Sequence, residues 1–162
     1  MSIFQRFRGA SLALAALAAT SAAWVALIIL APLLPSSLAT VVYLVASALC
    51  HQKPERSFHL EGAQLAVCAR CTGIYAAAAV VFIWLAVRKD DRPLRATTSS
   101  GAMTWLAVGA LPTLVTVALE SLRVAATSNT MRAGAGITLG AAVACVLGRA
   151  VTLPAWRQRP PA

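Results

Sequence analysis

Four long runs of hydrophobic residues alternate with shorter polar segments along the chain. The runs cover residues 10–34, 71–87, 102–122 and 134–153. Each is close to the length of about 20 apolar residues that a helix needs to cross the roughly 30 Å hydrocarbon core of a bilayer. We therefore predict an all-α integral membrane bundle of four spanning helices, forming one domain over residues 1–162.

A fifth, shorter apolar run occupies residues 38–49. It follows two prolines, and the hydroxyls of Ser36 and Ser37 are suited to cap a helix that begins there. A helix of this length measures about 18 Å at about 1.5 Å per residue, which is too short to cross a bilayer alone. We expect a re-entrant or interfacial helix.

Composition and charge support a membrane location. The chain is 59% hydrophobic and 12% charged, with a mean hydropathy of +0.75, which excludes a water-soluble globule. Its net charge of +9 comes from basic residues near the ends of the apolar runs, a topology signal rather than a nucleic-acid surface. We expect the lipid bilayer, and no nucleic acid, as the partner.

The distribution of Lys and Arg predicts the orientation. With four spans, the N-terminus, the 88–95 segment and the C-terminus share one side, and they carry nine basic residues against five on the other side. The positive-inside rule places those nine in the cytoplasm. The sequence therefore predicts a multi-pass protein of the cell membrane with both termini cytoplasmic and residues 50–70 exoplasmic.

Residues 50–71 contain three of the four cysteines and both histidines. Cys68 and Cys71 form a CxxC pair where the polar loop, residues 50–70, enters the second span, so both sulfurs fall on one helix face. Helix N-termini favour thiolates, and Arg70 between the two cysteines adds positive potential. Cys50 and one histidine, His51 or His59, complete a Cys3His set, which is an established zinc site.

Several chemistries fit these residues. The first is a bound transition metal, with zinc favoured and iron or copper as alternatives, held by Cys50, His51, Cys68 and Cys71. The second is a thiol-disulfide oxidoreductase that passes electrons to a quinone lying against Ile74 and Tyr75, with Cys68 and Cys71 as active pair and Cys50 as shuttle. A structural disulfide and reduced, packed cysteines remain open as well, so whether the protein is an enzyme stays undecided.

Other polar residues could support such a site or form one of their own. Arg56 either pairs with a carboxylate of its own loop or holds an anionic ligand. Glu120 lies at the end of the third span, where pairing with Arg123 would explain it, and a channel or carrier could instead use it to line a path. The residues predicted to surround the site are Gln52, Arg56, His59, Arg70, Glu120, Asn129 and Arg132.

Two further features of the fourth span concern packing. Gly136 and Gly140 form a GxxxG pattern that allows close helix contact, and they offer a face for a homo-oligomer. Cys145, in the same span, is expected to be a small packing residue.

One stretch of the chain resembles a known family. The matching residues are Cys50, His51, Gln52, Pro54, Arg56, Ser57 and Phe58, followed by the run Cys68-Ala69-Arg70-Cys71-Thr72-Gly73-Ile74-Tyr75. This signature resembles domain of unknown function 2085, a family of small bacterial and archaeal membrane proteins, over about residues 40–142. The resemblance implies a multi-span fold, and it implies that Cys50, His51, Arg56, Cys68 and Cys71 share one site. It implies no activity.

The second half of the resemblance departs from the family pattern at two positions. Thr116 stands where the pattern has an aspartate, and Glu120 stands where it has a glutamine. The resemblance therefore implies either that the acidic group has moved by one helical turn, with Glu120 as its substitute, or that this span does not have the role here that it has in the family. The positions that fit the pattern are Pro112, Ser128, Asn129, Arg132, Gly136 and Gly140.

Overall fold

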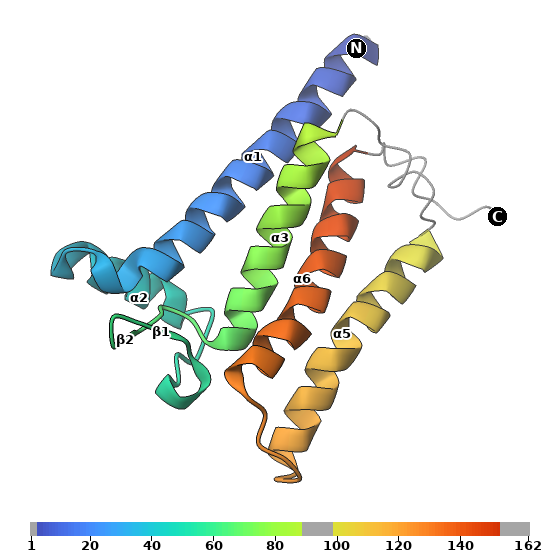
Figure 1. Cartoon of the computed structure of the whole chain (residues 1–162). Coiled ribbons are helices and arrows are strands. Elements are labelled where there is room, and N and C mark those ends of the chain that lie inside the picture. The colour runs from blue at the N-terminus through green and yellow to red at the C-terminus, as the bar shows by residue number, and fades with distance from the viewer. Residues whose placement is uncertain (1–2, 89–98, 153–162) are drawn as a thin grey trace.

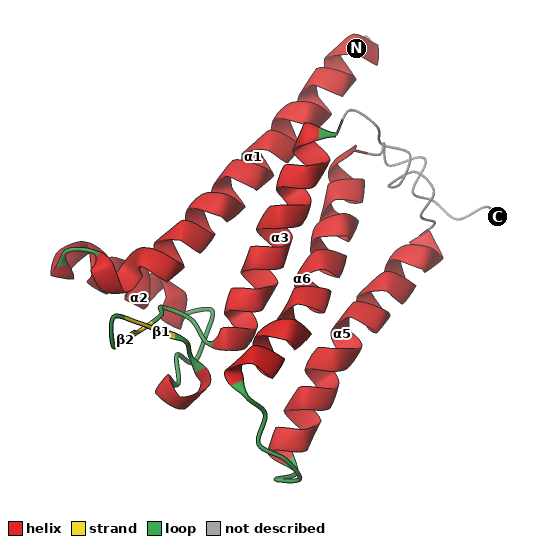
Figure 2. Ribbon diagram, in the orientation of Figure 1, coloured by secondary structure: helices red, strands yellow, loops and turns green. Residues whose placement is uncertain are grey.

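The computed structural model of the chain describes residues 3–88 and 99–152. Within these ranges the protein is a helical bundle (Figure 1), and the loops gather at its ends (Figure 2). The helices are α1 (Ile3–Leu30), α2 (Ser36–Ser47), α3 (Ala69–Val87), α5 (Ser99–Ser121) and α6 (Asn129–Thr152). Four of them are long and apolar enough to cross a membrane, while α2 is too short. The predicted all-α membrane bundle is confirmed.

The loop between α2 and α3 contains small elements that the hydrophobic pattern did not predict. They are a 3-10 turn, Pro54–Arg56, and an antiparallel pair of short strands, β1 (His59–Leu60) and β2 (Ala63–Gln64). Glu61 and Gly62 connect the strands, and both have positive φ. Two such residues form the tight turn that suits a two-residue hairpin. Another 3-10 turn, Ala31–Leu33, ends the first span.

One of the predicted boundaries that the structure changes is the start of α6. The hydrophobic pattern placed this start at residue 134, whereas the helix begins at Asn129. Ser128 explains the difference, because its hydroxyl accepts a hydrogen bond from the Met131 amide at 3.2 Å, as an N-cap residue does. Asn129 and Arg132 consequently lie in the first turn of α6 and not in the loop before it.

Helix α3 is central in the bundle and packs against both α1 and α6, while α5 packs chiefly against α6. The contact between α3 and α6 depends on glycine. A Cβ atom at Gly136 would collide with the carbonyl oxygen of Arg70, and one at Gly140 would collide with that of Ile74. The GxxxG face is therefore covered by α3 of the same chain. A homo-oligomer stays a prediction, but it cannot use this face.

The opposite surface of α6 holds a smaller correction. Cys145 is exposed and does not pack inside the bundle as expected. Its thiol is exposed on a helix that can span a membrane, so we expect it to contact lipid tails.

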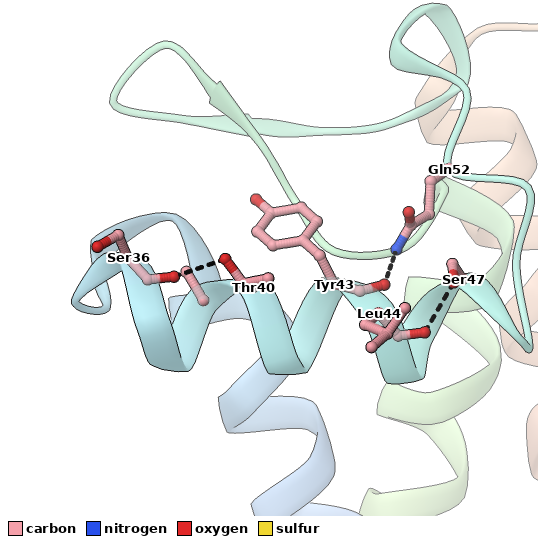
Figure 3. Close-up of a pocket in the computed structure, with 7 residues that line it drawn as sticks. Ser36, Thr40, Tyr43, Leu44, Ser47 and Gln52 are labelled. Carbon is pink, nitrogen blue, oxygen red and sulfur yellow. Dashed lines mark hydrogen bonds between the residues drawn. The ribbon is translucent and has the colours of Figure 1, made fainter.

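Helix α2 runs across the direction of the long helices, at the end of the bundle that holds the cysteine loop (Figures 1 and 3). Its polar side chains Ser36, Thr40, Tyr43 and Ser47 recur at helical spacing on the side of that loop. A buried face packs against the bundle through Val42 and Ala46. An exposed apolar face carries Leu38, Val41, Val45 and Leu49, and Leu44 is exposed as well, beside the polar residues. Of the two predicted roles, this arrangement fits an interfacial helix.

Candidate metal centre

Three sulfur atoms meet where α2, the loop and α3 converge. The Sγ atoms of Cys50, Cys68 and Cys71 all lie within 4.8 Å of one another. Cys50 is buried, and the other two cysteines are half-buried. All three are free thiols, and the backbone amide of Cys68 donates a hydrogen bond to Cys50 Sγ at 3.2 Å. The structure thus brings together the three predicted cysteine ligands.

Each sulfur is positioned by local backbone structure. The amide of Cys50 donates to the carbonyl of Ala46 at 2.9 Å, so Cys50 continues the last turn of α2. Cys68 is the N-cap residue of α3, and Cys71 lies in the first turn of that helix. The CxxC spacing therefore places both sulfurs on one side of the α3 N-terminus, as the helical period requires.

Hydrogen bonds from two glutamines hold the loop that returns the chain from Cys50 to Cys68. The Gln52 side-chain amide donates to the carbonyls of Tyr43 and Ala66 at 2.9 and 2.7 Å. The Gln64 amide donates to the carbonyl of Gln52 at 2.6 Å, and the Tyr43 hydroxyl donates to the carbonyl of Gln64. Gln52, predicted to surround the site, ties α2 directly to the segment that precedes Cys68.

The cluster lies at the edge of an apolar core. Ile28, Ala46, Ala66 and Val67 are completely buried and pack together with Cys50. Tyr75, half-buried beside them, meets the Trp24 ring edge-on with 6.1 Å between ring centroids. Ile28, Ala46, Ala66 and Val67 limit access of water to the sulfur atoms from this side.

Hydrogen bonding favours the thiolate form of Cys68. A hydrogen bond from the Cys71 thiol lowers the pKa of Cys68 to about 5, against the opposing effect of burial. The backbone amides of Cys71 and Arg70 and the Cys50 thiol contribute in the same direction. A thiolate is the form that binds metals and attacks disulfides.

The donor set fits a soft metal ion. Tetrahedral zinc with Zn–S bonds of about 2.3 Å places its sulfur ligands about 3.8 Å apart. The sulfurs here are separated by no more than 4.8 Å, so a small inward movement brings them to that spacing. Thiolates select zinc, copper or iron over magnesium and calcium.

Neither histidine joins the sulfurs. Among the residues that the structure describes, the group of potential ligands at this point consists of the three cysteines. His51, predicted as the fourth ligand, is exposed, and so is His59 on β1. The residue after His51, Gln52, adopts a positive φ of 48°, and its side chain, not that of His51, turns back to α2.

A second polar cluster lies at the same end of the bundle. Three arginines surround the carboxylate of Glu120, whose side chain is only 8% exposed. We call these four residues the Glu120 cluster: Glu120, Arg56, Arg70 and Arg132. The nitrogen–oxygen distances to Glu120 are 3.4 Å for Arg56, 3.7 Å for Arg70 and 2.8 Å for Arg132. The Thr127 hydroxyl also donates to this carboxylate.

Three more hydrogen bonds connect this cluster to Asn129, to the loop at Ser57 and to Thr116 of α5. Asn129 accepts from Arg132 Nη1 at 2.8 Å, and its side-chain amide donates to the carbonyl of Ser57 at 2.9 Å. Arg70 donates from Nη2 to Thr116 Oγ1 at 3.2 Å. Of the residues predicted around the site, Arg56, Arg70 and Arg132 thus meet Glu120 rather than the sulfurs, and Asn129 joins them through Arg132. Gln52 and His59 lie in the loop, away from Glu120.

The pairing of these charges differs from the two simplest sequence interpretations. Arg56 pairs with Glu120 on α5 and not with a carboxylate of its own loop, and Arg123 is exposed instead of pairing with Glu120. The sequence did hold a signal, because Thr116 and Glu120 mark two positions one turn apart on α5. Arg70 contacts both, so an acid at either position can lie beside it.

An open pocket of about 570 Å³ lies along the polar side of α2 (Figure 3). Ser36, Thr40, Tyr43, Ser47 and Gln52 supply its polar lining. Tyr75 and Ile74, against which a quinone was expected, do not line it. Quinone binding stays a prediction without support from this pocket.

The fold and this site define a class of protein: a multi-span membrane protein with a triad of cysteines at one end of its bundle. The profile of the family described as "Predicted membrane protein (DUF2085)" matches residues 50–146. This match covers more than half of the chain, and the chain belongs to that family. The matched region begins at the first cysteine of the triad and includes the Glu120 cluster.

Two archaeal proteins share part of this region. An uncharacterized protein of Methanocaldococcus jannaschii is 47% identical over 51 residues, which are 31% of this chain and 33% of that protein. An uncharacterized protein of Methanothermobacter thermautotrophicus is 50% identical over 36 residues, 22% of this chain and 32% of that protein. The chain thus matches about a third of the length of these curated relatives. No solved structure matches.

Proposed function

We propose that this protein binds a transition metal at Cys50, Cys68 and Cys71, with zinc as the favoured ion and iron or copper as alternatives. The convergence of three soft donors within 4.8 Å of one another supports the proposal. The low pKa of Cys68 acts in the same direction, because ligation requires the thiolate.

Three protein ligands leave one tetrahedral position for a ligand from outside the cluster. Structural zinc sites are closed by four protein ligands, whereas catalytic sites keep one position open. Water, a donor group of a partner or a repositioned His51 can fill that place. An open position favours a metal that is exchanged, sensed or used in catalysis over one whose only role is to stabilise the loop.

The decisive measurement is the metal content of protein purified in mild detergent without chelator, determined by mass spectrometry beside a free-thiol count. We expect near-stoichiometric zinc, iron or copper in the wild type and its loss in Cys68→Ser/Cys71→Ser. Cys145→Ser is the matched control, since this thiol is exposed and does not belong to the group of three sulfurs, and this variant should keep the metal. A metal-free wild type with all thiols reactive contradicts the proposal.

A thiol oxidoreductase is the second candidate, and the pairing of a low-pKa Cys68 with Cys71 favours it. In that reaction the two thiols form a disulfide and release two electrons and two protons, which reduce a quinone to its quinol. Thiols that react only after a reductant is added, together with quinone reduction by the dithiol form, would establish it. A channel or carrier has less support, because Glu120, Asn129 and Arg132 bind one another.

For sidedness we propose that the cysteine loop is exoplasmic. In Figure 1 the beginning of α1 and the end of α6 lie at one end of the bundle, and the loop lies at the opposite end. The charge bias then assigns the loop to the outside. Reporter fusions at the two termini test this: activity of a cytoplasmic reporter at both ends is expected, and activity of a periplasmic reporter would reverse the assignment.

A further inference from the structure

We propose that Glu120 is a positioning residue for the cysteine triad and that it acts through Arg70 and Arg56. The inference rests on the proposed metal site and adds a residue on a helix, α5, that carries none of the thiols. Glu120 touches no sulfur. Its effect passes through two arginines, each located in a segment that carries or connects the cysteines.

Arg70 provides the connection to the CxxC pair. It lies between Cys68 and Cys71 in the first turn of α3, and its guanidinium extends to α5, 3.2 Å from Thr116 Oγ1 and 3.7 Å from Glu120. Because α5 packs chiefly against α6, this contact is a specific bridge from α5 to the start of α3. It fixes the rotation of the turn from which both thiols project.

Arg56 provides the connection to the loop between Cys50 and Cys68. Its Nη1 atom lies 3.4 Å from the second oxygen of the same carboxylate. The next residue, Ser57, is 1% exposed, and its carbonyl accepts from Asn129 in α6. The middle of the loop is therefore attached to α5 and α6 by a charge pair and a hydrogen bond, while Gln52 attaches its beginning to α2.

The charge of Glu120 is what holds this arrangement. The carboxylate is nearly buried, and Arg132 supports it from α6 at 2.8 Å. Removing the negative charge would leave three guanidinium groups close together with no counter-charge among them, which is unfavourable because Arg70 and Arg132 are largely buried. Arg56 and Arg70 would then separate, and the two segments that carry the sulfurs would no longer be fixed relative to each other.

The test is Co²⁺ binding to the purified, metal-stripped protein, followed through the thiolate-to-metal charge-transfer absorption. Residues that orient metal ligands typically contribute about 10–100-fold in affinity, and we expect a loss of that size in Glu120→Gln, with a weaker charge-transfer band and unchanged helix content. Arg123→Gln is the control, because Arg123 is exposed and lies only three residues away on the chain. It should bind Co²⁺ as the wild type does.

A relocated charge separates positioning from general stability. In Thr116→Asp/Glu120→Gln the carboxylate returns one turn away, beside Arg70, and we expect recovery of most of the lost affinity. If Glu120→Gln does not fold, Arg56→Gln removes one connection at a residue whose side chain is 40% exposed and should weaken binding less.

The possible results lead to different conclusions. Wild-type affinity and spectrum in Glu120→Gln overturn the positioning role and leave the metal site intact. Failure of the relocated acid to restore binding, with both proteins folded, overturns it as well. A wild type that binds no Co²⁺ overturns the proposed metal site, and the positioning role falls with it.

Discussion

The α3–α6 contact and the cysteine end of the bundle are built on different principles. In the former, glycine brings two backbones so close that a single added carbon would collide with a carbonyl group. At the cysteine end, long polar side chains bridge α2, the loop, α3, α5 and α6 across greater separations. The first region is specified by side-chain size and the second by donors, acceptors and charge.

This difference predicts which substitutions each region tolerates. The α3–α6 contact should accept changes that keep residues small, whatever their chemistry. The cysteine end should accept changes of size that keep the hydrogen bonds and charges. The predictions below test this division, beginning with the largest effect.

The first prediction concerns the closest backbone contact. Gly140→Ala places a Cβ atom against the carbonyl oxygen of Ile74, and we expect destabilisation at or above the about 1–3 kcal/mol typical of overpacked cores. Gly134→Ala is the control in the same helix, because nothing lies within 4 Å of its Cβ position. It should be stabilising by about 0.5–1 kcal/mol. Unfolding in detergent measures both, and equal effects would contradict the size-based description of this contact.

The second prediction removes one thiol. Removal of an outer-shell partner of a metal ligand lowers affinity by about 10–100-fold, and Cys50→Ser should lower metal affinity by more than this. The melting temperature of the helices should change little. Cys145→Ser should have no effect on the metal. Retention of wild-type affinity in Cys50→Ser would mean that the CxxC pair binds metal without the third sulfur.

The third prediction removes the metal itself. Chelation should increase amide hydrogen exchange in residues 50–68. Exchange in α6, and in α3 beyond its first turn, should not change, because the glycine contacts hold α3 and α6 together. Hydrogen-exchange mass spectrometry resolves the two regions. Equal deprotection of both would show that the metal stabilises the whole bundle and that the two regions are not independent.

The fourth prediction concerns His51. Because the structure leaves it exposed and outside the sulfur group, His51→Ala should preserve metal stoichiometry and affinity. A large loss in this variant would instead identify His51 as the fourth ligand and imply that the loop moves when metal binds. His59→Ala, which alters the other exposed histidine, serves as the comparison.

The smallest expected effect concerns α2 and the bilayer. A photo-crosslinking amino acid at Val41, on the exposed apolar face, should attach to lipid in reconstituted membranes. The same group at Thr40, on the polar side, should not. Mass spectrometry of the crosslinked protein distinguishes the two, and equal lipid labelling would favour a re-entrant position over an interfacial one.

The sequence was sufficient for the parts of the structure that depend on local signals. Hydrophobic runs identified all four spans and the short α2, and the CxxC spacing placed two sulfurs together at a helix start. Cys50 could be assigned to the same site because a loop of that length can return to its starting point. These inferences need only chain periodicity and reach.

What the sequence did not predict depends on contacts between distant residues. The charge partner of Arg56 lies 64 positions later, at Glu120, and no local pattern distinguishes this carboxylate from Glu55 or Glu61. Asn129 and Arg132 carry no hydropathy signal, so the hydrophobic pattern does not predict the first turn of α6, which depends on the Ser128 cap. His51 is exposed although it is next to the buried Cys50, and adjacency in the sequence does not reveal this difference.

The hydrogen bond from the Cys50 amide to the Ala46 carbonyl attaches this cysteine to the end of α2. The other two sulfurs lie at the start of α3. The three sulfurs therefore connect the end of α2 to the start of α3. If they move closer together around a metal ion, α2 should rotate or slide as a unit against α3. Metal binding would then move the whole of α2, and this movement would change the position of the helix at the membrane surface.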